Sequence, residues 1–542
     1  MTASTLSEMT IREPGSFIGR PKSVNLMDLF VQGTVGMAAR SCWNRRDFLG
    51  LAGCGAAGWA LLGAGGRALW GAMNGKNKRR NIVFVLSDDH RYDFMSFVKG
   101  SPAFLETPNM DRMAREGAHL ANAFVSTSLC SPSRASILTG RYMHNHQVVD
   151  NQRPVPAGTV FFPQYLQRAG YETAFVGKWH MGHDDDAPRP GFDHWVSFKG
   201  QGVYFDPTLN INSEHRKFNG YSTDILTDQA LEWLKGGRDA GKPFFLYLSF
   251  KAVHHPFQPA ERHRGRYEKG EVKRPETMAN TEENYQTQPH WVRERRYSIH
   301  GVDHMETGQY DNDPVPSFDD LYRRYCETVH GLDENLGRLL DYLDETGLSK
   351  STLVMYMGDN GFALGEHGFY DKRDAFEESI RVPMLAYAPG FIEAGTKVAQ
   401  MVQNIDVAPT LLAAAGVKPA KEAKMDGLSF LPLLRGESIG WRDHILYEYY
   451  WEWNFPATPT VFAIRSERYK YIFYHGVWDY DGFYDLQTDP HERHNLIDVP
   501  AYAEQIAAMQ KQLFDELEAG GGLVMPIRRP LGEQLDQRKN RR

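Results

Sequence analysis

Short apolar runs rich in β-forming residues alternate with longer amphipathic segments along most of the chain. The residues from Ile82 to Leu86 read Ile-Val-Phe-Val-Leu, a run that is typical of a strand covered on both faces. Similar runs predict strands over 173–176, 244–250, 353–357 and 383–387. Helical spacing between them predicts helices over 109–116, 162–168, 223–234, 321–345 and 405–415. This alternation predicts an α/β fold with a large, mostly parallel central sheet and helices on both faces.

The pattern changes after about residue 440. Residues 463–474 and 478–486 are rich in aromatic side chains with turn residues between them, which predicts antiparallel hairpins, and a helix is expected over 501–518. We therefore predict a catalytic domain over 76–440 and a small C-terminal α+β subdomain with an antiparallel sheet over 441–542. Residues 257–320 carry many charges and little periodicity, which indicates a substrate-facing insertion.

Residues 1–75 are expected to form an export signal and a linker. The segment Asn44-Arg45-Arg46-Asp47-Phe48-Leu49 resembles a twin-arginine export signal, and no charge occurs from Phe48 to Gly66. We therefore expect a periplasmic or secreted protein whose mature chain has no stable membrane span. An Ala/Gly-rich helix and a single membrane anchor are the alternatives. Leu51-Ala52-Gly53-Cys54 also resembles a lipoprotein box, but it follows the arginine pair too closely for lipid anchoring at Cys54 to be favoured.

Composition narrows the classes of function that the chain can serve. Its 542 residues include 61 Lys and Arg against 68 Asp and Glu, a formal net charge of −7, and 42% of the residues are hydrophobic. That apolar content excludes a disordered chain. The acidic balance argues against a general nucleic-acid binder, but a locally positive pocket for a small anion remains compatible with it. Four cysteines cannot build a disulfide framework.

Acidic and amide side chains follow two of the predicted strands. Asp88 and Asp89 come directly after the first strand, and Asp359 and Asn360 follow the strand at 353–357. Ligands of open α/β sheets bind beyond the carboxyl ends of the strands. Three carboxylates and an amide oxygen suit Ca²⁺ or Mg²⁺. Either pair alone would be ordinary turn chemistry, but two pairs placed alike predict a metal site.

The segment Cys130-Ser131-Pro132-Ser133-Arg134 precedes a helical pattern. A lone cysteine there would most simply be a buried side chain. With Pro132 and Arg134 at these offsets, however, the opening of a helix places a possible nucleophile beside a cation and free backbone N–H groups. That arrangement predicts a site for an anion.

This segment resembles the C-x-P-S-R signature of the type I, formylglycine-dependent sulfatases of the alkaline phosphatase superfamily. In that family the cysteine is oxidised to Cα-formylglycine. The resemblance covers residues 81–500 and includes the segments Ser87-Asp88-Asp89, Gly177-Lys178-Trp179-His180, Lys251-Ala252-Val253-His254-His255-Pro256, Gly358-Asp359-Asn360-Gly361 and Tyr370-Asp371-Lys372-Arg373. It implies an alkaline-phosphatase-like fold, hydrolysis of a sulfate monoester, and maturation by a formylglycine-generating enzyme.

The resemblance also implies roles for individual positions. One Ca²⁺ ion is expected at Asp88, Asp89, Asp359, Asn360 and the formylglycine made from Cys130. The sulfate is expected among Arg134, Lys178, His180, His254 and Lys372. One hydroxyl of the hydrated aldehyde attacks sulfur, and the other then loses a proton so that sulfate is expelled. We assign His254 to protonation of the leaving alcohol and His180 to the base, with Lys372 as an alternative proton donor.

Lys178 and His180 are two residues apart at a predicted strand exit. If the chain stays extended there, both side chains leave the same face of the sheet, which agrees with the implied shared role at the sulfate.

The alcohol part of the ester is expected to be a sugar. Residues 200–207 and 447–455 are rich in aromatic and amide side chains, which suit stacking on sugar faces and hydrogen bonds to hydroxyl groups. Residues 190–230 and 291–304 resemble exported glycan sulfatases, among them N-acetylglucosamine-6-sulfatases and mucin-desulfating enzymes. The 6-sulfate of N-acetylglucosamine is therefore the first candidate. A phosphonate monoester or phosphodiester hydrolase of the same superfamily, and a non-catalytic glycan-binding protein, are the alternatives.

Overall fold

A ten-stranded sheet organises the part of the chain that the computed structural model describes, residues 79–306, 317–420, 423–532 and 534. These residues all belong to one compact unit, Lys78–Arg542. The expected export signal, with Arg45-Arg46 and Cys54, lies outside the described residues, and its role stays a prediction. Within the described ranges, no helix has both the length and the apolar character that a membrane crossing requires.

The five predicted strands form the centre of this sheet. Strand β1 (Asn81–Ser87) pairs in parallel with β8 (Phe244–Ser249) on one side and β9 (Thr352–Gly358) on the other. Strand β4 (Glu172–Lys178) is parallel to β8, and β10 (Met384–Tyr387) is antiparallel to β9. The prediction of a mostly parallel central sheet is confirmed.

Sequence patterns did not predict the short strands. Strand β7 is exposed at the edge of the sheet and reads Glu-His-Arg-Lys, which has no apolar period to detect and is the kind of charged edge that discourages pairing between molecules. The short strands of the large sheet and of a separate two-stranded sheet are β2 (Ala118–Leu120), β3 (Ala123–Phe124), β5 (His194–Phe198), β6 (Thr208–Ile211), β7 (Glu214–Lys217), β11 (Thr396–Val398) and β12 (Val402–Gln403).

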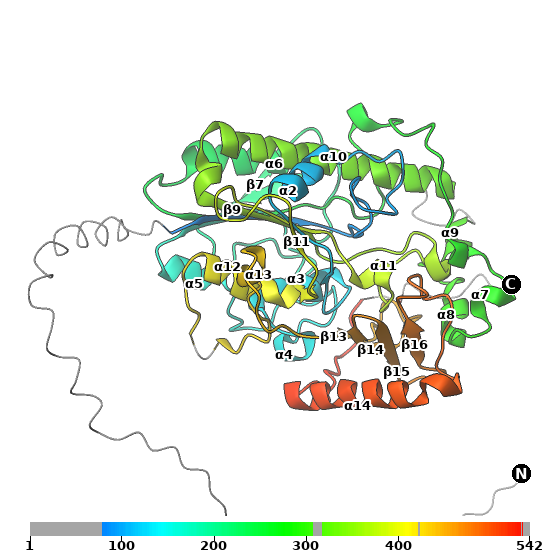
Figure 1. The fold of residues 1–542 in the computed structure, drawn as a ribbon. Helices are drawn as coiled ribbons and strands as arrows, with labels where there is room; N and C mark the ends of the chain where they lie inside the picture. The colour runs from blue at the N-terminus through cyan, green and yellow to red at the C-terminus, as the bar shows by residue number, and fades with distance from the viewer. Residues whose placement is uncertain (1–78, 307–316, 421–422, 533, 535–542) are drawn as a thin grey trace, which may run out of the picture. The chain divides into compact units, whose positions relative to one another are not determined.

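Helices cover both faces of the large sheet (Figure 1). One face carries α2 (Pro108–Glu116), α6 (Ser222–Glu232) and α10 (Phe318–Glu345), and the other carries α3 (Cys130–Thr139), α4 (Met143–His146), α5 (Pro163–Arg168), α12 (Val407–Ala414) and α13 (Leu431–Leu434). Alternate residues of β1 enter different cores, Phe84 on the α3 side and Val85 on the α10 side. A strand buried on both faces needs apolar residues at every position, which explains the continuous run from Ile82 to Leu86.

The C-terminal part forms a four-stranded antiparallel sheet of β13 (His444–Tyr449), β14 (Thr460–Ser466), β15 (Tyr469–His475) and β16 (Gly482–Asp485). Helix α14 (Ala503–Gly520) packs against it, with Leu513 and Leu517 in a shared core (Figure 1). The predicted hairpin at 463–474 is β14–β15, whereas 478–486 contains only β16. The boundary at residue 440 stays a prediction, because both sheets belong to one compact unit.

Residues 257–306 consist of short helical turns joined by loops, as the lack of periodicity in the sequence indicated. The turns in this segment are η2 (Glu261–His263), η3 (Glu276–Met278), α7 (Glu282–Tyr285), α8 (His290–Arg295) and α9 (Val302–Glu306). Other short turns are η1 (Trp233–Gly237), η4 (Leu348–Ser351), η5 (Glu366–Gly368), α11 (Glu377–Ile380), η6 (Asn404–Asp406) and η8 (Pro500–Tyr502).

Candidate active site

The carboxyl ends of the neighbouring strands β1 and β9 bring the four predicted metal-site side chains together, because Ser87 and Gly358 stand opposite each other in the register. The backbone N–H of Asp89 donates to Asp359 Oδ1 at 3.1 Å, and Asn360 Nδ2 donates to Asp89 Oδ1 at 2.6 Å. One oxygen each from Asp88, Asp89 and Asp359 lie within 4.8 Å of one another, and all three residues are buried.

Two oxygens of this cluster lack a hydrogen-bond donor. Asp89 Oδ2 and Asn360 Oδ1 are buried and accept no hydrogen bond from the described residues. Burial raises the pKa of Asp89 to about 7, with Lys372 opposing the shift and Asp88 and Asp359 adding to it. Buried polar atoms without partners are costly, and a divalent cation with hard oxygen ligands would satisfy them. The residues present therefore fit the expected Ca²⁺.

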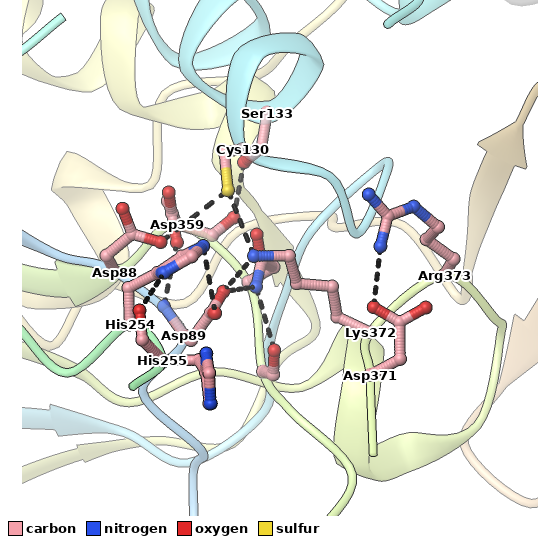
Figure 2. A network of polar contacts seen from close by, with 12 residues as sticks. Asp88, Asp89, Cys130, Ser133, His254, His255, Asp359, Asp371, Lys372 and Arg373 are labelled. Atoms are coloured by element: carbon pink, nitrogen blue, oxygen red, sulfur yellow. Dashed lines mark hydrogen bonds and ion pairs between the residues drawn. The ribbon is translucent and has the colours of Figure 1, made fainter. Parts of the chain in front are cut away.

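Cys130 is the first residue of α3, and its sulfur points from the start of that helix toward the carboxylates (Figure 2). Its Sγ lies 3.6 Å from Asp88 Oδ1 and 3.0 Å from Lys372 Nζ. Burial and the Asp88 charge raise the pKa of the Cys130 thiol to about 12, against Lys372 and Lys178. The thiol therefore stays protonated near neutral pH and is itself a weak nucleophile.

The cation beside Cys130 differs from the one that the C-x-P-S-R spacing suggested. It is Lys372, which also forms an ion pair with Asp89 Oδ1. The nearby backbone N–H of Ser131 is not free, because it donates to Asn151 Oδ1 at 3.0 Å. Burial would lower the pKa of Lys372, but Asp89, Cys130 and Asp88 hold it well above its usual value. Lys372 therefore carries a positive charge at the nucleophile position near neutral pH.

Arg134 lies behind the carboxylates. Its Nε and Nη2 donate to Asp359 Oδ2 at 3.0 and 2.8 Å, and Nη2 also donates to Asp88 Oδ2 at 3.1 Å. Its Nη1 donates to the Lys178 carbonyl and to Ser249 Oγ, both at 2.7 Å. These contacts use all five N–H donors of the guanidinium. Arg134 thus holds the metal-site carboxylates, and the expected contact with sulfate would require one of these bonds to break.

Lys178 ends β4, and its ammonium group pairs with Asp88 Oδ2 and donates to Gln201 Oε1. The preceding Gly177 has φ +122°, and a Cβ there would lie 1.8 Å from the Ser249 carbonyl oxygen. Only glycine therefore lets β4 approach β8 this closely, next to the lysine.

His180 does not continue the extended chain, because its φ is +58°. The argument that an extended strand exit aims Lys178 and His180 at the same face was therefore wrong. His180 is nevertheless buried beside the start of α3, where Ser131 Oγ donates to its carbonyl. Burial and Lys178 hold the pKa of His180 well below its usual value, so the ring is neutral near pH 7. Its buried Nδ1 has no hydrogen-bond partner among the described residues.

The loop after β8 supplies His254 and Lys251. His254 Nδ1 lies 2.7 Å from the His255 carbonyl oxygen, and its Nε2 lies 3.8 Å from Asp89 Oδ2. Since a carbonyl only accepts, Nδ1 carries the proton and Nε2 faces the site. Burial and Lys178 lower the pKa of Lys251 to about 7. Lys251 lies in the same segment as His254, which carries the family resemblance, but the sequence indicated no role for it.

A pocket of about 530 Å³ opens over this cluster. Its wall includes Asp89, Asn151, Gln201, Gly202, Lys251, His254, His255, Pro256, Ile299, His300, His304, Phe362, Tyr370, Asp371, Lys372, Arg373 and Phe455. The segments 200–207, 291–304 and 447–455 each contribute to it, as expected for substrate recognition. Tyr447 and Tyr449 do not, because they belong to β13 and are buried in the core.

Arg373 and Asp371, on either side of Lys372, form a buried ionic network in the pocket wall that sequence reasoning missed. Arg373 Nη1 contacts Asp371 Oδ1 at 2.7 Å (Figure 2). Arg373 Nε contacts Glu452 Oε1, also at 2.7 Å. The ring of Phe455 lies 4.0 Å from the guanidinium carbon. Their position next to Lys372 could have marked Asp371 and Arg373 as residues of the site. The contact with Glu452 could not be predicted, because Glu452 is distant in the sequence.

Comparisons with known proteins agree with this geometry. The family model described as "Sulfatase" matches residues 80–417, and the model described as "N-sulphoglucosamine sulphohydrolase, C-terminal" matches residues 365–519. The chain is 33% identical to an N-acetylglucosamine-6-O-sulfatase of Bacteroides thetaiotaomicron over 82% of this chain and 86% of that relative. It is 30% identical to the N-acetylglucosamine-6-sulfatase of Homo sapiens over 71% of this chain and 69% of that relative.

A solved structure has a similar fold. The structure of BT4656 in complex with its substrate D-glucosamine-2-N,6-O-disulfate has a TM-score of 0.75 and 31% identity, covering 82% of this chain and 99% of that chain.

Proposed function

The chain belongs to the sulfatase family of the alkaline phosphatase superfamily, and from this premise we propose that it hydrolyses a sulfate monoester of a sulfated glycan. The 6-sulfate of an N-acetylglucosamine residue is the first candidate. The observation that carries the proposal is the position of Cys130, with its sulfur between Asp88 and Lys372 beside a pocket lined with polar and aromatic side chains. The named substrates of the relatives support the choice of sugar.

Ca²⁺ would be held by Asp88, Asp89, Asp359 and Asn360, together with the modified residue at position 130. When bound, it supplies positive charge and polarises the oxygen that attacks sulfur. Arg134 holds two of the carboxylates in place through three hydrogen bonds. Second-sphere support of this kind fixes the orientation of ligands before a metal binds.

We propose that Cys130 is oxidised to formylglycine by a formylglycine-generating enzyme, because it is the cysteine of the C-x-P-S-R segment. The unmodified thiol, with its raised pKa, would be a weak nucleophile. The hydrated aldehyde supplies two hydroxyl groups on one carbon, one for attack on sulfur and one for release of sulfate. Mass spectrometry of a peptide spanning residues 125–141 tests this. We expect the mass of an aldehyde at position 130, and an unmodified thiol in the active enzyme would contradict the proposal.

The basic side chains of the site would bind and orient the sulfate group. Lys178 and Lys372 approach from the metal side, and Lys251 lies in the pocket wall. The Nδ1–H of His254 is held by the His255 carbonyl, so Nε2 is the nitrogen that faces the leaving oxygen. To protonate that oxygen, the ring would act as the imidazolium, which gives up the proton on Nε2 and keeps the one on Nδ1. His180 would accept the proton of the second hydroxyl, and Lys372 is the alternative donor.

The test compares four substrates under the same conditions. N-acetylglucosamine-6-sulfate and a 4-sulfated hexosamine test the position of the ester, and p-nitrophenyl sulfate and phenyl phosphonate test the reacting group. We expect sulfate to be preferred to phosphonate and the 6-sulfate to be preferred to the 4-sulfate. A preference for phosphonate would favour the phosphonate hydrolase alternative, and binding without turnover would favour a glycan-binding protein.

We also propose that the chain is exported by a twin-arginine signal. Replacement of Arg45 and Arg46 by lysine in the producing cell should retain the protein in the cytoplasm, and an unchanged distribution between cell fractions would contradict this.

A further inference from the structure

A second pocket, of about 230 Å³, lies beside the catalytic pocket. It is formed by three segments that are distant in the sequence, namely residues 149–153, residues 450–454 with Thr460, and residues 525–531 near the C-terminus. None of the roles proposed above uses this pocket.

The two pockets share a wall. Asn151 lines the catalytic pocket, while Asp150 and Gln152 on either side of it line the second pocket. In the same way, Phe455 lines the catalytic pocket and its neighbour Asn454 lines the second pocket. Glu452 lines the second pocket and contacts Arg373 of the catalytic pocket at 2.7 Å. The two pockets are therefore adjacent, as the binding sites of two linked sugar residues must be.

Two tryptophans contribute to the apolar part of the wall of the second pocket. Trp451 is 45% exposed and Trp453 is 37% exposed, in a fold whose other tryptophans are mostly buried. Their rings are 6.3 Å apart at 79° to each other, and Trp451 Nε1 donates to the Pro456 carbonyl at 3.2 Å. Partly exposed indole rings that are held in place offer rigid contact area at little entropic cost. Such surfaces suit the C–H faces of a sugar ring.

The charge of the second pocket is positive. Arg153 pairs with Asp150, and Glu452 pairs with Arg373, so the two acidic side chains of the wall are compensated. Arg528 and Arg529 are exposed, and neither forms an ion pair with a carboxylate of the described part of the chain. The Arg528 guanidinium donates to Gln147 Oε1 and to the Ile527 carbonyl, which are both neutral. A ligand with a negative charge would therefore meet two guanidinium groups whose charge no described carboxylate neutralises.

We propose that this pocket binds the sugar residue next to the one that carries the reacting sulfate, and that this neighbour bears an acidic group, either a carboxylate or a second sulfate. Trp451 and Trp453 contact its ring, and Arg528 and Arg529 contact its charge. The inference rests on the proposed function, because it places the sulfated residue of the same glycan in the catalytic pocket.

The test uses two substrates with the same reacting ester, N-acetylglucosamine-6-sulfate alone and the disaccharide in which it is linked to a uronic acid. For the disaccharide, Trp453→Ala should raise KM about 3- to 10-fold, the range of one aromatic contact. The double variant Arg528→Gln/Arg529→Gln should raise KM about 2- to 5-fold at low salt and less at high salt. Neither variant should change kcat/KM for the monosaccharide by more than about twofold. Trp478→Ala is the control, because Trp478 is 91% exposed and lies outside both pockets.

A binding measurement separates this inference from the proposed function. In a Cys130→Ala background, calorimetry should show that the disaccharide binds more tightly than the monosaccharide, and that Trp453→Ala reduces the difference. Two results would overturn the proposal that the second pocket binds the neighbouring sugar, even if the enzyme hydrolyses the monosaccharide. One is equal affinity for the two sugars, and the other is a Trp453→Ala effect no larger than that of Trp478→Ala. Absence of hydrolysis of both sugars by the unaltered enzyme would instead overturn the proposed function, while the calorimetry still decides on the pocket.

Discussion

Substitution of Arg134 tests whether its hydrogen bonds to Asp88 and Asp359 keep these carboxylates in place to bind a metal ion. The guanidinium is 1% exposed and makes five hydrogen bonds, three of them to carboxylates that are proposed to bind Ca²⁺. Arg134→Lys retains the charge but offers three donors to the four acceptor atoms that Arg134 serves. Arg134→Ala removes the charge and leaves Asp88 and Asp359 without this partner.

The expected size of the effect follows from these contacts. One buried acceptor that loses its donor costs about 1–3 kcal/mol, so Arg134→Lys should lower the free energy of unfolding by about that amount. Removal of one partner of a buried ion pair costs about 3–5 kcal/mol, the value expected for Arg134→Ala. Loss of a residue that orients metal ligands typically lowers metal affinity or activity about 10- to 100-fold. Both variants should therefore bind Ca²⁺ and turn over sulfate ester that much more weakly.

The assay combines urea unfolding in the presence of a chelator with calorimetric titration of Ca²⁺. Arg465→Lys is the matched control, because this buried guanidinium contacts Glu377 Oε1 and Oε2 at 2.9 and 3.0 Å outside the catalytic pocket. It should lose stability in the chelator while calcium affinity and kcat stay unchanged. If Arg134→Lys behaves like the control, with full calcium affinity and full turnover, the guanidinium is only a structural group and the reasoning fails.

Three further predictions concern single groups. Cys130→Ala should reduce hydrolysis to a trace while circular dichroism shows an unchanged fold, and more than trace turnover would refute the nucleophile assignment. Removal of Ca²⁺ by a chelator should lower the midpoint of thermal unfolding, because Asp89 Oδ2 and Asn360 Oδ1 then lose their partner. If the ion was present at 100 times its Kd, the lost stability corresponds to about 2.7 kcal/mol. An unchanged midpoint would argue against a metal at this site. Glu378 raises the pKa of His491 to about 9. The pair should therefore stabilise the fold fully at a pH below about 6.5, the pKa of a histidine in the unfolded chain. This stabilisation should be lost as the pH rises through 9. Since the His491 side chain is 69% exposed, this pairing should contribute at most about 1 kcal/mol. The measurement compares the thermal midpoints of the unaltered protein and of His491→Gln from pH 6 to 10. A difference between the two midpoints that stays constant over this pH range would contradict the prediction.

Long-range packing decided how the site residues contact one another. The spacing from Cys130 to Arg134 suggested a cysteine beside an arginine, but Arg134 turns to the carboxylates and Lys372 takes the place beside the sulfur. The left-handed backbone of His180 overturned an argument that assumed an extended chain. Local patterns cannot reveal such outcomes, because they report whether a position is buried and not which partner it meets.

The sequence by itself determined the parts that depend on neighbouring residues. A strand that is buried on both faces must be apolar at every position, so Ile82 to Leu86 could be recognised, and the acidic residues after β1 and β9 marked the edge where ligands bind. The tertiary structure alone decided which distant segments share a surface. The second pocket is the clearest case, since residues 149–153, 450–454 and 525–531 meet only after the two sheets and the C-terminal segment have packed. No periodicity connects those segments, because contacts between distant segments are set by the packing of whole elements.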